Sequence, residues 1–211
     1  MKIRFSGLKE FVYTEVKEKL INNSIKPGER IWEDKIAEEL GVSRTPVREA
    51  INRLIAEELI ENRPRKGLFA TEISNKELEK MLDIRIALET LAAKMCCEMI
   101  TESQKYELKS IFENYKAKLN SNKYVEASQL DSEIHRFIAK VSDSKRLVTY
   151  INELEDVFAY TRTNVVKWTQ EKKVRSISDH QELVEAICNH DDKHSIKMIQ
   201  QDINAMRDLL K

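Results

Sequence analysis

The chain has 211 residues, of which 41% are hydrophobic and 34% are charged, and its 36 basic and 36 acidic side chains give a formal net charge of zero. This balance is typical of a folded globular protein and excludes an intrinsically disordered one, while the length allows one or two domains. Only four glycines and three prolines are present. Because few residues interrupt helices, we expect a mostly α-helical protein.

No apolar run approaches the roughly 18 residues that a membrane-spanning helix needs, and residues 1–10 lack the apolar core of a signal peptide. The three cysteines, Cys96, Cys97 and Cys188, have no spacing typical of a metal site. An odd number of such residues is typical of reduced thiols packed in a core. We therefore expect a cytoplasmic protein with no membrane association.

The first part of the chain predicts three helices in close succession. Apolar residues recur at helical spacing over about 6–23, and a second helix is expected at 33–40. Gly41 provides the turn after it, because glycine adopts a positive φ without steric cost. A third helix begins between residues 43 and 46 and ends near Glu57. Its inward face is formed by Val47, Ala50, Ile51, Leu54 and Ile55.

Two short extended segments follow, at 59–62 and 68–71, on either side of the basic stretch RPRKG at 63–67. This pattern predicts a β-hairpin with a basic tip. Helix, helix, turn, helix and basic hairpin together predict a winged helix-turn-helix domain over residues 1–73.

The remainder of the chain is expected to be entirely helical. Ser74 followed by Glu77 resembles a capping box, which places the domain boundary at 72–75. The fold class is therefore mostly α: a winged helix-turn-helix and an antiparallel all-α bundle over 75–211. Six helices are expected, at about 75–100, 104–121, 123–141, 145–167, 173–190 and 192–210.

The third helix carries the residue types that read DNA. Arg44 and Arg48 are four residues apart and share one helix face, and arginine pairs bidentately with guanine O6 and N7. Ser43 and Thr45 lie at the helix start, where hydroxyl and backbone N–H groups bind phosphate. The alternative is an ordinary solvated helix face.

The hairpin tip offers a second set of contacts. Arg65 and Lys66 are long donors, and Gly67 permits a close approach to a nucleic-acid groove or backbone. A net charge of zero does not exclude DNA binding, since binding depends on a local patch. Residues 44–66 contain six basic and four acidic side chains.

Residues 27–71 closely resemble the DNA-binding domain of the GntR family of bacterial regulators, through the stretches PGER (27–30), IAEELGVSRTPVREA (36–50) and PRKG (64–67). The resemblance implies that the family's DNA-contacting positions are Ser43, Arg44, Thr45, Arg48 and Gly67. Three residues depart from the family pattern. Trp32 replaces the usual Ser N-cap, Glu58 replaces a helix-ending Gly, and Asp34 replaces a residue that is basic in some members.

The helical part contains polar residues on faces that point inward. Asp131 and His135 are four residues apart on one helix, and a carboxylate and an imidazole on one face form half of a divalent-metal site. His180 precedes an apolar stripe on another helix, and Asp202 lies on the inner face of the last one. Each residue alone is more simply a hydrogen-bonded core residue, but a metal offsets the cost of burying all four.

This part resembles the FadR-type C-terminal (FCD) domain of the same family, which implies a bundle that binds small carboxylates, often through a metal ion. The resemblance implies that Asp131, His135 and His180 match three of the four usual ligands. The fourth is normally His and is Asp202 here. The implied cofactor is a divalent metal ion such as Zn²⁺, Ni²⁺ or Mn²⁺.

Arg85 and Glu89 fall on the apolar stripe of the helix that starts near residue 75. Arginine is rarely buried without a partner. One interpretation is an internal salt bridge. The other is that Arg85 binds the carboxylate of an effector, and the family resemblance favours an effector role nearby.

The leading hypothesis is a ligand-responsive transcriptional regulator, a repressor released by a small organic acid. A homodimer would place two recognition helices on double-stranded DNA at a palindromic operator. One alternative is a metal sensor in which the ion is the signal. The other is a metal-dependent enzyme using Asp131, His135 and His180; against it, the sequence contains no separate general base and no nucleophile motif. We therefore expect no enzymatic activity.

Overall fold

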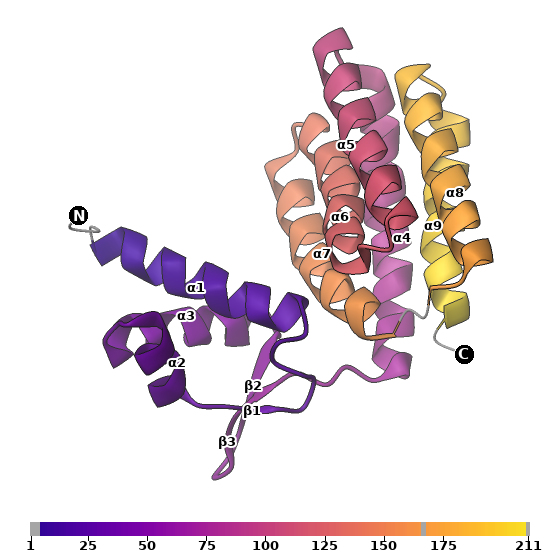
Figure 1. Ribbon diagram of the computed structural model, residues 1–211. Helices are drawn as coiled ribbons and strands as arrows, with labels where there is room; N and C mark the ends of the chain where they lie inside the picture. The colour runs from indigo at the N-terminus through magenta and orange to yellow at the C-terminus, as the bar shows by residue number, and fades with distance from the viewer. Residues whose placement is uncertain (1–4, 166–167, 210–211) are drawn as a thin grey trace. The chain divides into compact units, whose positions relative to one another are not determined.

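The computed structural model describes the backbone of residues 5–165 and 168–209 and divides into two compact units, Met1–Ile73 and Ser74–Lys211 (Figure 1). The expected helix ends at residues 167 and 210 lie outside the described residues. Each unit is built around its own buried apolar side chains.

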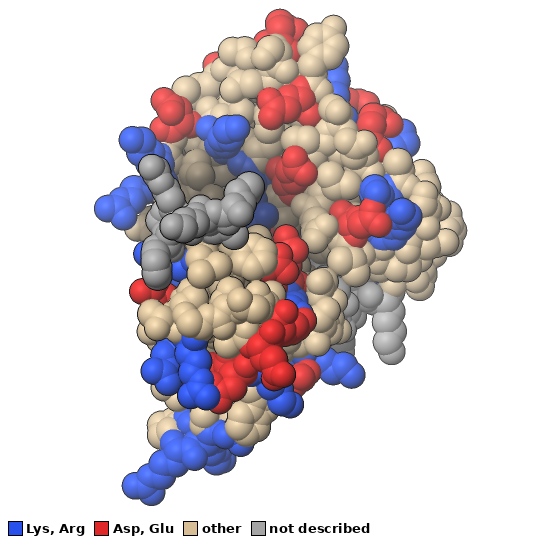
Figure 2. All heavy atoms as spheres, turned by 60° about the vertical axis from the view of Figure 1, so that its left-hand side comes forward, with Lys and Arg blue, Asp and Glu red and all other residues tan. Residues whose placement is uncertain are grey.

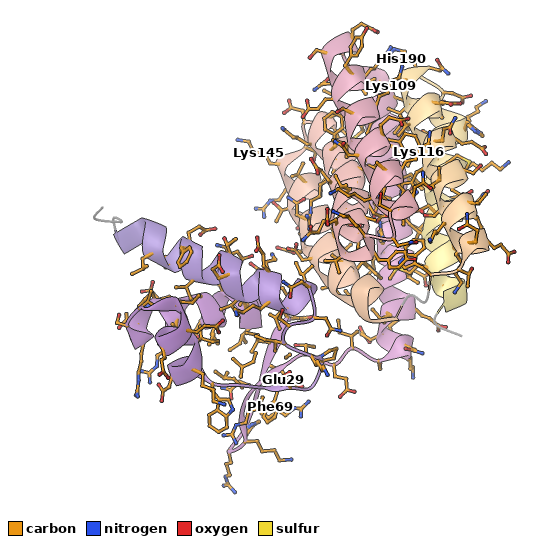
Figure 3. The ribbon with its side chains drawn as sticks, viewed as in Figure 1. Glu29, Phe69, Lys109, Lys116, Lys145 and His190 are labelled. Carbon is orange, nitrogen blue, oxygen red and sulfur yellow. The ribbon has the colours of Figure 1, made fainter. Side chains whose placement is uncertain are left out.

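The N-terminal unit contains three helices and a small sheet: α1 (Phe5–Ile21), β1 (Arg30–Ile31), α2 (Glu33–Leu40), α3 (Arg44–Ala56), β2 (Ile60–Arg63) and β3 (Gly67–Ala70). The strands are antiparallel in the order β1-β3-β2. Strand β1 was not predicted, because two residues are too short to show an alternating pattern. The backbone N–H of Ala70 donates to the carbonyl of Glu29 at 2.9 Å, and Figure 3 labels Glu29 and Phe69 on these neighbouring segments.

Helices α2 and α3 meet at a tight turn that fixes the direction of α3. Gly41 ends α2 in the left-handed conformation, with φ at 64°, and its backbone N–H bonds back to the last turn of α2. The inner face of α3 then packs on α1. The buried contributors from these two helices are Val12, Val16, Leu20, Val47, Ala50, Ile51 and Leu54. Burial of this face leaves the opposite face of α3 in solvent.

Helix α3 ends without the glycine that this turn favours. Glu58 has a φ of 59°, and the backbone N–H of Leu59 donates to the carbonyl of Leu54 at 3.0 Å. This six-to-one hydrogen bond is the hallmark of a Schellman cap, in which the left-handed position is usually glycine. Glu58 therefore adopts a strained conformation at the position where the sequence departs from the family.

The hairpin tip is a compact turn of basic residues. Pro64 fixes the first corner, Arg65 occupies the second with a φ of 63°, and the Lys66 N–H donates to the Arg63 carbonyl at 2.9 Å. Figure 2 shows basic side chains gathered at this protruding tip of the N-terminal unit.

The second unit is an antiparallel bundle of long helices joined by short loops. Its elements are α4 (Asn75–Met99), α5 (Glu102–Asn120), α6 (Tyr124–Val141), α7 (Lys145–Val165), α8 (Gln170–Cys188) and α9 (Asp192–Leu209). The closest neighbours are α4 and α9, α5 and α6, α6 and α7, and α8 and α9. The predicted class, a winged helix-turn-helix and an all-α bundle, is confirmed.

Side-chain caps set several helix starts. Ser74 Oγ accepts from the backbone N–H of Glu77 at 3.2 Å, as the sequence predicts. Thr101 forms a reciprocal capping box with Gln104, and Thr169 caps α8, so α5 and α8 begin a few residues earlier than expected. In the described part of the chain, no helix is long and apolar enough to cross a membrane.

Candidate DNA-reading surface and candidate metal site

The exposed side of α3 presents the arginines that the sequence singled out. Arg44 and Arg48 are both mainly exposed, whereas Val47 and Ala50 on the same helix are buried. Ser43 is the N-cap residue of α3, and its side chain makes no capping hydrogen bond in the described structure. The hydroxyl of Ser43 and the first backbone N–H groups of α3 are therefore available to bind an anion at the start of this helix.

Each of these arginines has an acidic neighbour that the sequence pattern did not indicate. The Nε of Arg44 lies 2.7 Å from Oδ1 of Asp34, and the Nε of Arg48 donates to Oε2 of Glu33 at 3.3 Å. Both acids are in the first turn of α2, whose N-cap residue Trp32 provides no side-chain cap. Negative charge is favourable there because of the helix dipole.

A hollow of about 460 Å³ separates α3 from the sheet. Its walls come from the start of α2, the outer face of α3 and both hairpin strands, and include Arg30, Trp32, Arg44, Arg48, Asn52 and Asn62. The Arg30 guanidinium lies over the Trp32 ring, 3.9 Å from its centre. The hollow therefore has arginines and amides on its walls together with the two acids Glu33 and Asp34.

The predicted wing contacts are all accessible from solvent. Arg65 and Lys66 are exposed, and Gly67 has a φ of 104°. A Cβ at Gly67 would come within 3.3 Å of the Arg30 guanidinium. Glycine is therefore favoured at this position both by its backbone conformation and by the close approach of Arg30.

In the bundle, the structure brings three of the four expected ligands into one group and places the fourth, Asp202, beside both histidines. Asp131 and His135 on α6 and His180 on α8 are buried and offer donor atoms that lie within 4.8 Å of one another. His180 Nε2 is 3.2 Å from Asp131 Oδ1. Asp202 on α9 joins them, with its Oδ2 3.3 Å from His135 Nε2.

Each of the two imidazoles has an oxygen atom beside its Nδ1, and the two rings are nearly perpendicular, at 80°. The Nδ1 of His180 lies 2.9 Å from the carbonyl of Ser176, and the Nδ1 of His135 contacts the Glu89 carboxylate. In the neutral form of such an imidazole, an Nδ1 that donates to oxygen leaves the lone pair on Nε2, where a cation can bind. Both Nε2 atoms, and also the Nδ1 of His135, are buried and make no well-aligned hydrogen bond within the described residues.

Arg85 is buried in an internal charge network. Its Nε contacts Glu89, and its Nη2 lies 2.6 Å from Glu155 Oε1. Arg85 is 1% exposed and Glu155 is fully buried. The internal salt bridge, one of the two interpretations of Arg85, is therefore present. Its assignment as an effector-binding residue stays a prediction.

The charges of this cluster shift one another's protonation. Burial on its own lowers the pKa of His135, but the carboxylates of Glu89 and Asp202 outweigh it and raise the pKa to about 10. The pKa of His180 is raised in the same way by Asp202 and Asp131. Burial raises the pKa of Asp202, but the neighbouring imidazoles and Arg85 hold it well below its usual range. When no cation is bound, protons on the two imidazoles therefore offset the negative charge of the neighbouring carboxylates.

This donor set fits a divalent cation. The two histidines and the Asp131 carboxylate offer buried donor atoms within 4.8 Å of one another, the Nε2 atoms lack a well-aligned partner, and a cation would satisfy them together. Asp131, His135, His180 and Asp202 would hold it, and Glu89 would orient His135. Two nitrogen and two carboxylate donors suit Zn²⁺, Ni²⁺ and Mn²⁺.

Sequence reasoning missed two members of the network as site residues. Glu89 was noted only as a neighbour of Arg85, although it contacts His135, one of the candidate metal ligands. Glu155 was not noted, yet it follows Leu147 and Ile151 on the buried stripe of α7, and this spacing was the available signal.

Comparison with known proteins agrees with both halves of the structure. Residues 8–69 match the family model for bacterial regulatory proteins of the gntR family, and residues 79–205 match the FCD domain. The HTH-type transcriptional regulator YdhC of Bacillus subtilis is 29% identical over 180 residues, which cover 83% of this chain and 78% of YdhC.

Two further relatives extend over nearly the whole chain. The gluconate operon transcriptional repressor of Bacillus subtilis is 26% identical over 92% of this chain and 81% of its own length. The structure of E. coli McbR/YncC superposes with a TM-score of 0.86 at 22% identity, covering 96% of each chain. These relatives are transcriptional regulators, so the expectation of no enzymatic activity is confirmed. The chain belongs to the GntR family of DNA-binding bacterial regulatory proteins, in the FadR-like group that joins a winged helix-turn-helix to an FCD domain.

Proposed function

We propose that this chain is a homodimeric, cytoplasmic repressor that binds a palindromic operator through residues 1–73 and is released by a small carboxylate acting at a metal-bearing bundle, residues 75–211. The observation that carries the proposal is the pairing of two features in one chain. Arg44 and Arg48 are exposed on a helix with a buried back, and Asp131, His135 and His180 converge in a separate buried core.

The DNA contacts are assigned to Ser43, Arg44, Thr45 and Arg48 on α3 and to the wing residues Arg65, Lys66 and Gly67. Exposure of the arginines, the free N–H groups at the start of α3 and the basic hairpin tip support this assignment. The repressor role is supported by the similarity to the gluconate operon repressor. Binding affinity should fall steeply with salt, because cationic side chains displace counterions from the phosphates.

The experiment first enriches a DNA duplex from a random pool with the full-length wild-type protein. Binding of that duplex is then measured by fluorescence anisotropy for Arg44→Ala, for Arg48→Ala and for Arg146→Ala, a control that removes an exposed arginine from α7. We expect the first two variants to lose specific binding while keeping their circular dichroism, and the control to bind as wild type. Normal binding by both recognition-helix variants would refute the assignment.

A dimer is supported by an apolar stripe on the outer face of α4. Ile84, Leu91 and Met99 are each about half exposed and lie two turns apart on one helix face, with Leu88 and Met95 between them. Native mass spectrometry of the purified protein, with metal analysis, should report a dimer and the bound ion together. Leu91→Glu should shift the dimer to monomer, whereas Lys94→Glu, beside the stripe, should not.

A second candidate function is a metal sensor, in which the ion is the signal. The observation that favours it is the internal pairing of Arg85 with Glu89 and Glu155, which engages the guanidinium that an acid effector was expected to use. In a sensor, the metal alone would change DNA affinity. In a carboxylate-responsive repressor, the metal would hold the acid, and DNA affinity would change when the acid is added.

A further inference from the structure

The reading arginines of α3 share an arrangement that the exposed wing arginine lacks. Arg44 and Arg48 each have a carboxylate from the first turn of α2 beside them, Asp34 at 2.7 Å and Glu33 at 3.3 Å. Acids next to a DNA-reading surface repel phosphate, so their presence needs an explanation beyond the favourable helix dipole.

The atoms involved suggest that explanation. In both pairs the contact is with Nε, at the side edge of the guanidinium; the Arg48 pair is a hydrogen bond and the Arg44 pair is an ionic contact. The other edge, formed by Nη1 and Nη2, is the one that bonds end-on to the O6 and N7 of guanine. Both arginines remain mainly exposed, at 65% and 62%. A carboxylate beside Nε restricts the orientation of the guanidinium and leaves its terminal edge available for another partner.

We propose that Asp34 and Glu33 are positioning residues for DNA reading: each binds the Nε of one recognition arginine, orients its terminal edge toward a guanine, and penalises contacts with bare phosphate. This inference rests on the proposed assignment of α3 as the recognition helix. It makes the acids determinants of specificity rather than of affinity.

Magnitudes favour this arrangement. An exposed ion pair changes an equilibrium by a factor of about five or less, whereas a bidentate arginine–guanine contact discriminates by a factor of roughly five to one hundred and fifty. The two carboxylates therefore compete with DNA phosphates for the same arginines, because an arginine–phosphate contact is an ion pair of similar strength. A guanine that bonds to the terminal edge adds its hydrogen bonds while the carboxylate keeps its contact with Nε.

The test compares two duplexes of equal length and base composition, one enriched by wild-type protein and one of random sequence. Two full-length variants are compared with wild type. The first is the double variant Glu33→Ala/Asp34→Ala. The second is the single variant Asp34→Asn, which keeps an oxygen acceptor for the Nε of Arg44. The control is Glu18→Ala, which removes one exposed negative charge from α1 in the same unit. Circular dichroism checks that α2 is retained, and Asp34→Asn serves where the double variant loses it.

We expect the double variant to bind the random duplex about two- to fivefold more tightly than wild type and to discriminate between the duplexes at least about tenfold less. Asp34→Asn should keep part of the discrimination. If the double variant gained the same affinity for both duplexes, the acids would compete with phosphate without positioning the arginines. If its affinities matched those of Glu18→Ala, the acids would have no role. Either outcome overturns the inference. Failure of Arg44→Ala and Arg48→Ala to weaken binding would instead overturn the recognition-helix assignment.

Discussion

Glu89 on α4 contacts the Nδ1 of His135 on α6, and the Nε2 of the same ring lies 3.3 Å from Asp202 on α9. Glu89 is itself held by Arg85, and Arg85 by Glu155 on α7. A chain of ionic contacts thus joins three bundle helices to the imidazole of a candidate metal ligand. Such outer carboxylates fix the orientation and raise the basicity of a ligating histidine.

Neutralising Glu89 should weaken metal binding without removing a ligand. We expect Glu89→Gln to lower the affinity for Zn²⁺, Ni²⁺ or Mn²⁺ by about 10- to 100-fold, because His135 loses its orienting partner. His180→Ala should lose binding almost completely. Isothermal titration calorimetry on metal-stripped protein measures both, and Glu182→Gln, on the exposed side of α8, is the matched control. Equal affinities for Glu89→Gln and wild type would contradict the orienting role.

Exchanging Asp202, the fourth proposed ligand, should change which ion is preferred. Asp202→His replaces a hard oxygen donor by an imidazole, and nitrogen donors favour Zn²⁺ and Ni²⁺ over Mn²⁺. We therefore expect the ratio of Zn²⁺ to Mn²⁺ affinity to rise in this variant, as measured by competition between the two ions. Asn204→His, an exposed change two residues along α9, provides the control. An unchanged ratio would show that Asp202 is not a ligand.

The strained end of α3 predicts a stabilising substitution. Glu58 has a φ of 59°, a conformation in which glycine has no steric penalty. We expect Glu58→Gly to raise the free energy of unfolding of the N-terminal unit by about 0.5–1 kcal/mol. Glu49→Gly, in the middle of α3, should lower it by a similar amount. Both changes are measured by urea unfolding in a Trp168→Phe background, in which the fluorescence of Trp32 reports on the N-terminal unit. A lower free energy of unfolding for Glu58→Gly than for wild type would contradict the prediction.

Acid should destabilise the N-terminal unit through Glu57. Burial on its own raises the pKa of this carboxyl, but hydrogen bonds from Tyr13 at 2.7 Å and Lys17 at 3.0 Å outweigh it, so the pKa is lowered. A carboxyl with a lowered folded pKa contributes stability above its unfolded pKa, near 4.5. That contribution is lost as the pH falls through the folded value.

The corresponding measurement is the melting temperature across this pH range in the same Trp168→Phe background. We expect Glu57→Gln to melt below wild type at neutral pH, with the difference shrinking as the pH falls below about 4.5. Glu49→Gln, which removes an exposed charge from α3, should follow wild type throughout. A gap between wild type and Glu57→Gln that stays constant with pH would exclude this role.

Sequence patterns were sufficient where the signals are local. The turn at Gly41, the buried face of α3 and the cap at Ser74 depend on residues a few positions apart, and the structure has them as expected. The inward positions of Asp131, His135 and His180 followed from helical periodicity in the same way. Strand β1 was missed because two residues carry no periodic signal, and its pairing with β3 joins distant parts of the chain.

Contacts between distant residues could not be predicted from these patterns. Nothing in the spacing of Glu89 and His135 predicts their contact, which depends on how α4 packs on α6. The contact of Asp34 with Arg44 likewise depends on the angle between α2 and α3. Periodicity places a residue on a face but does not choose its partner across an interface.

Coupling between the two units is central to the proposed function: DNA binding by this chain should respond to what the bundle binds. The most direct measurement is the anisotropy of the enriched duplex with full-length protein, titrated first with Zn²⁺, Ni²⁺ or Mn²⁺ and then with a panel of small mono-, di- and hydroxycarboxylates. We predict that at least one acid releases the DNA from metal-loaded wild type but not from His180→Ala. Release by metal alone would identify a metal sensor, and DNA affinity that stays unchanged through both titrations would contradict the coupling.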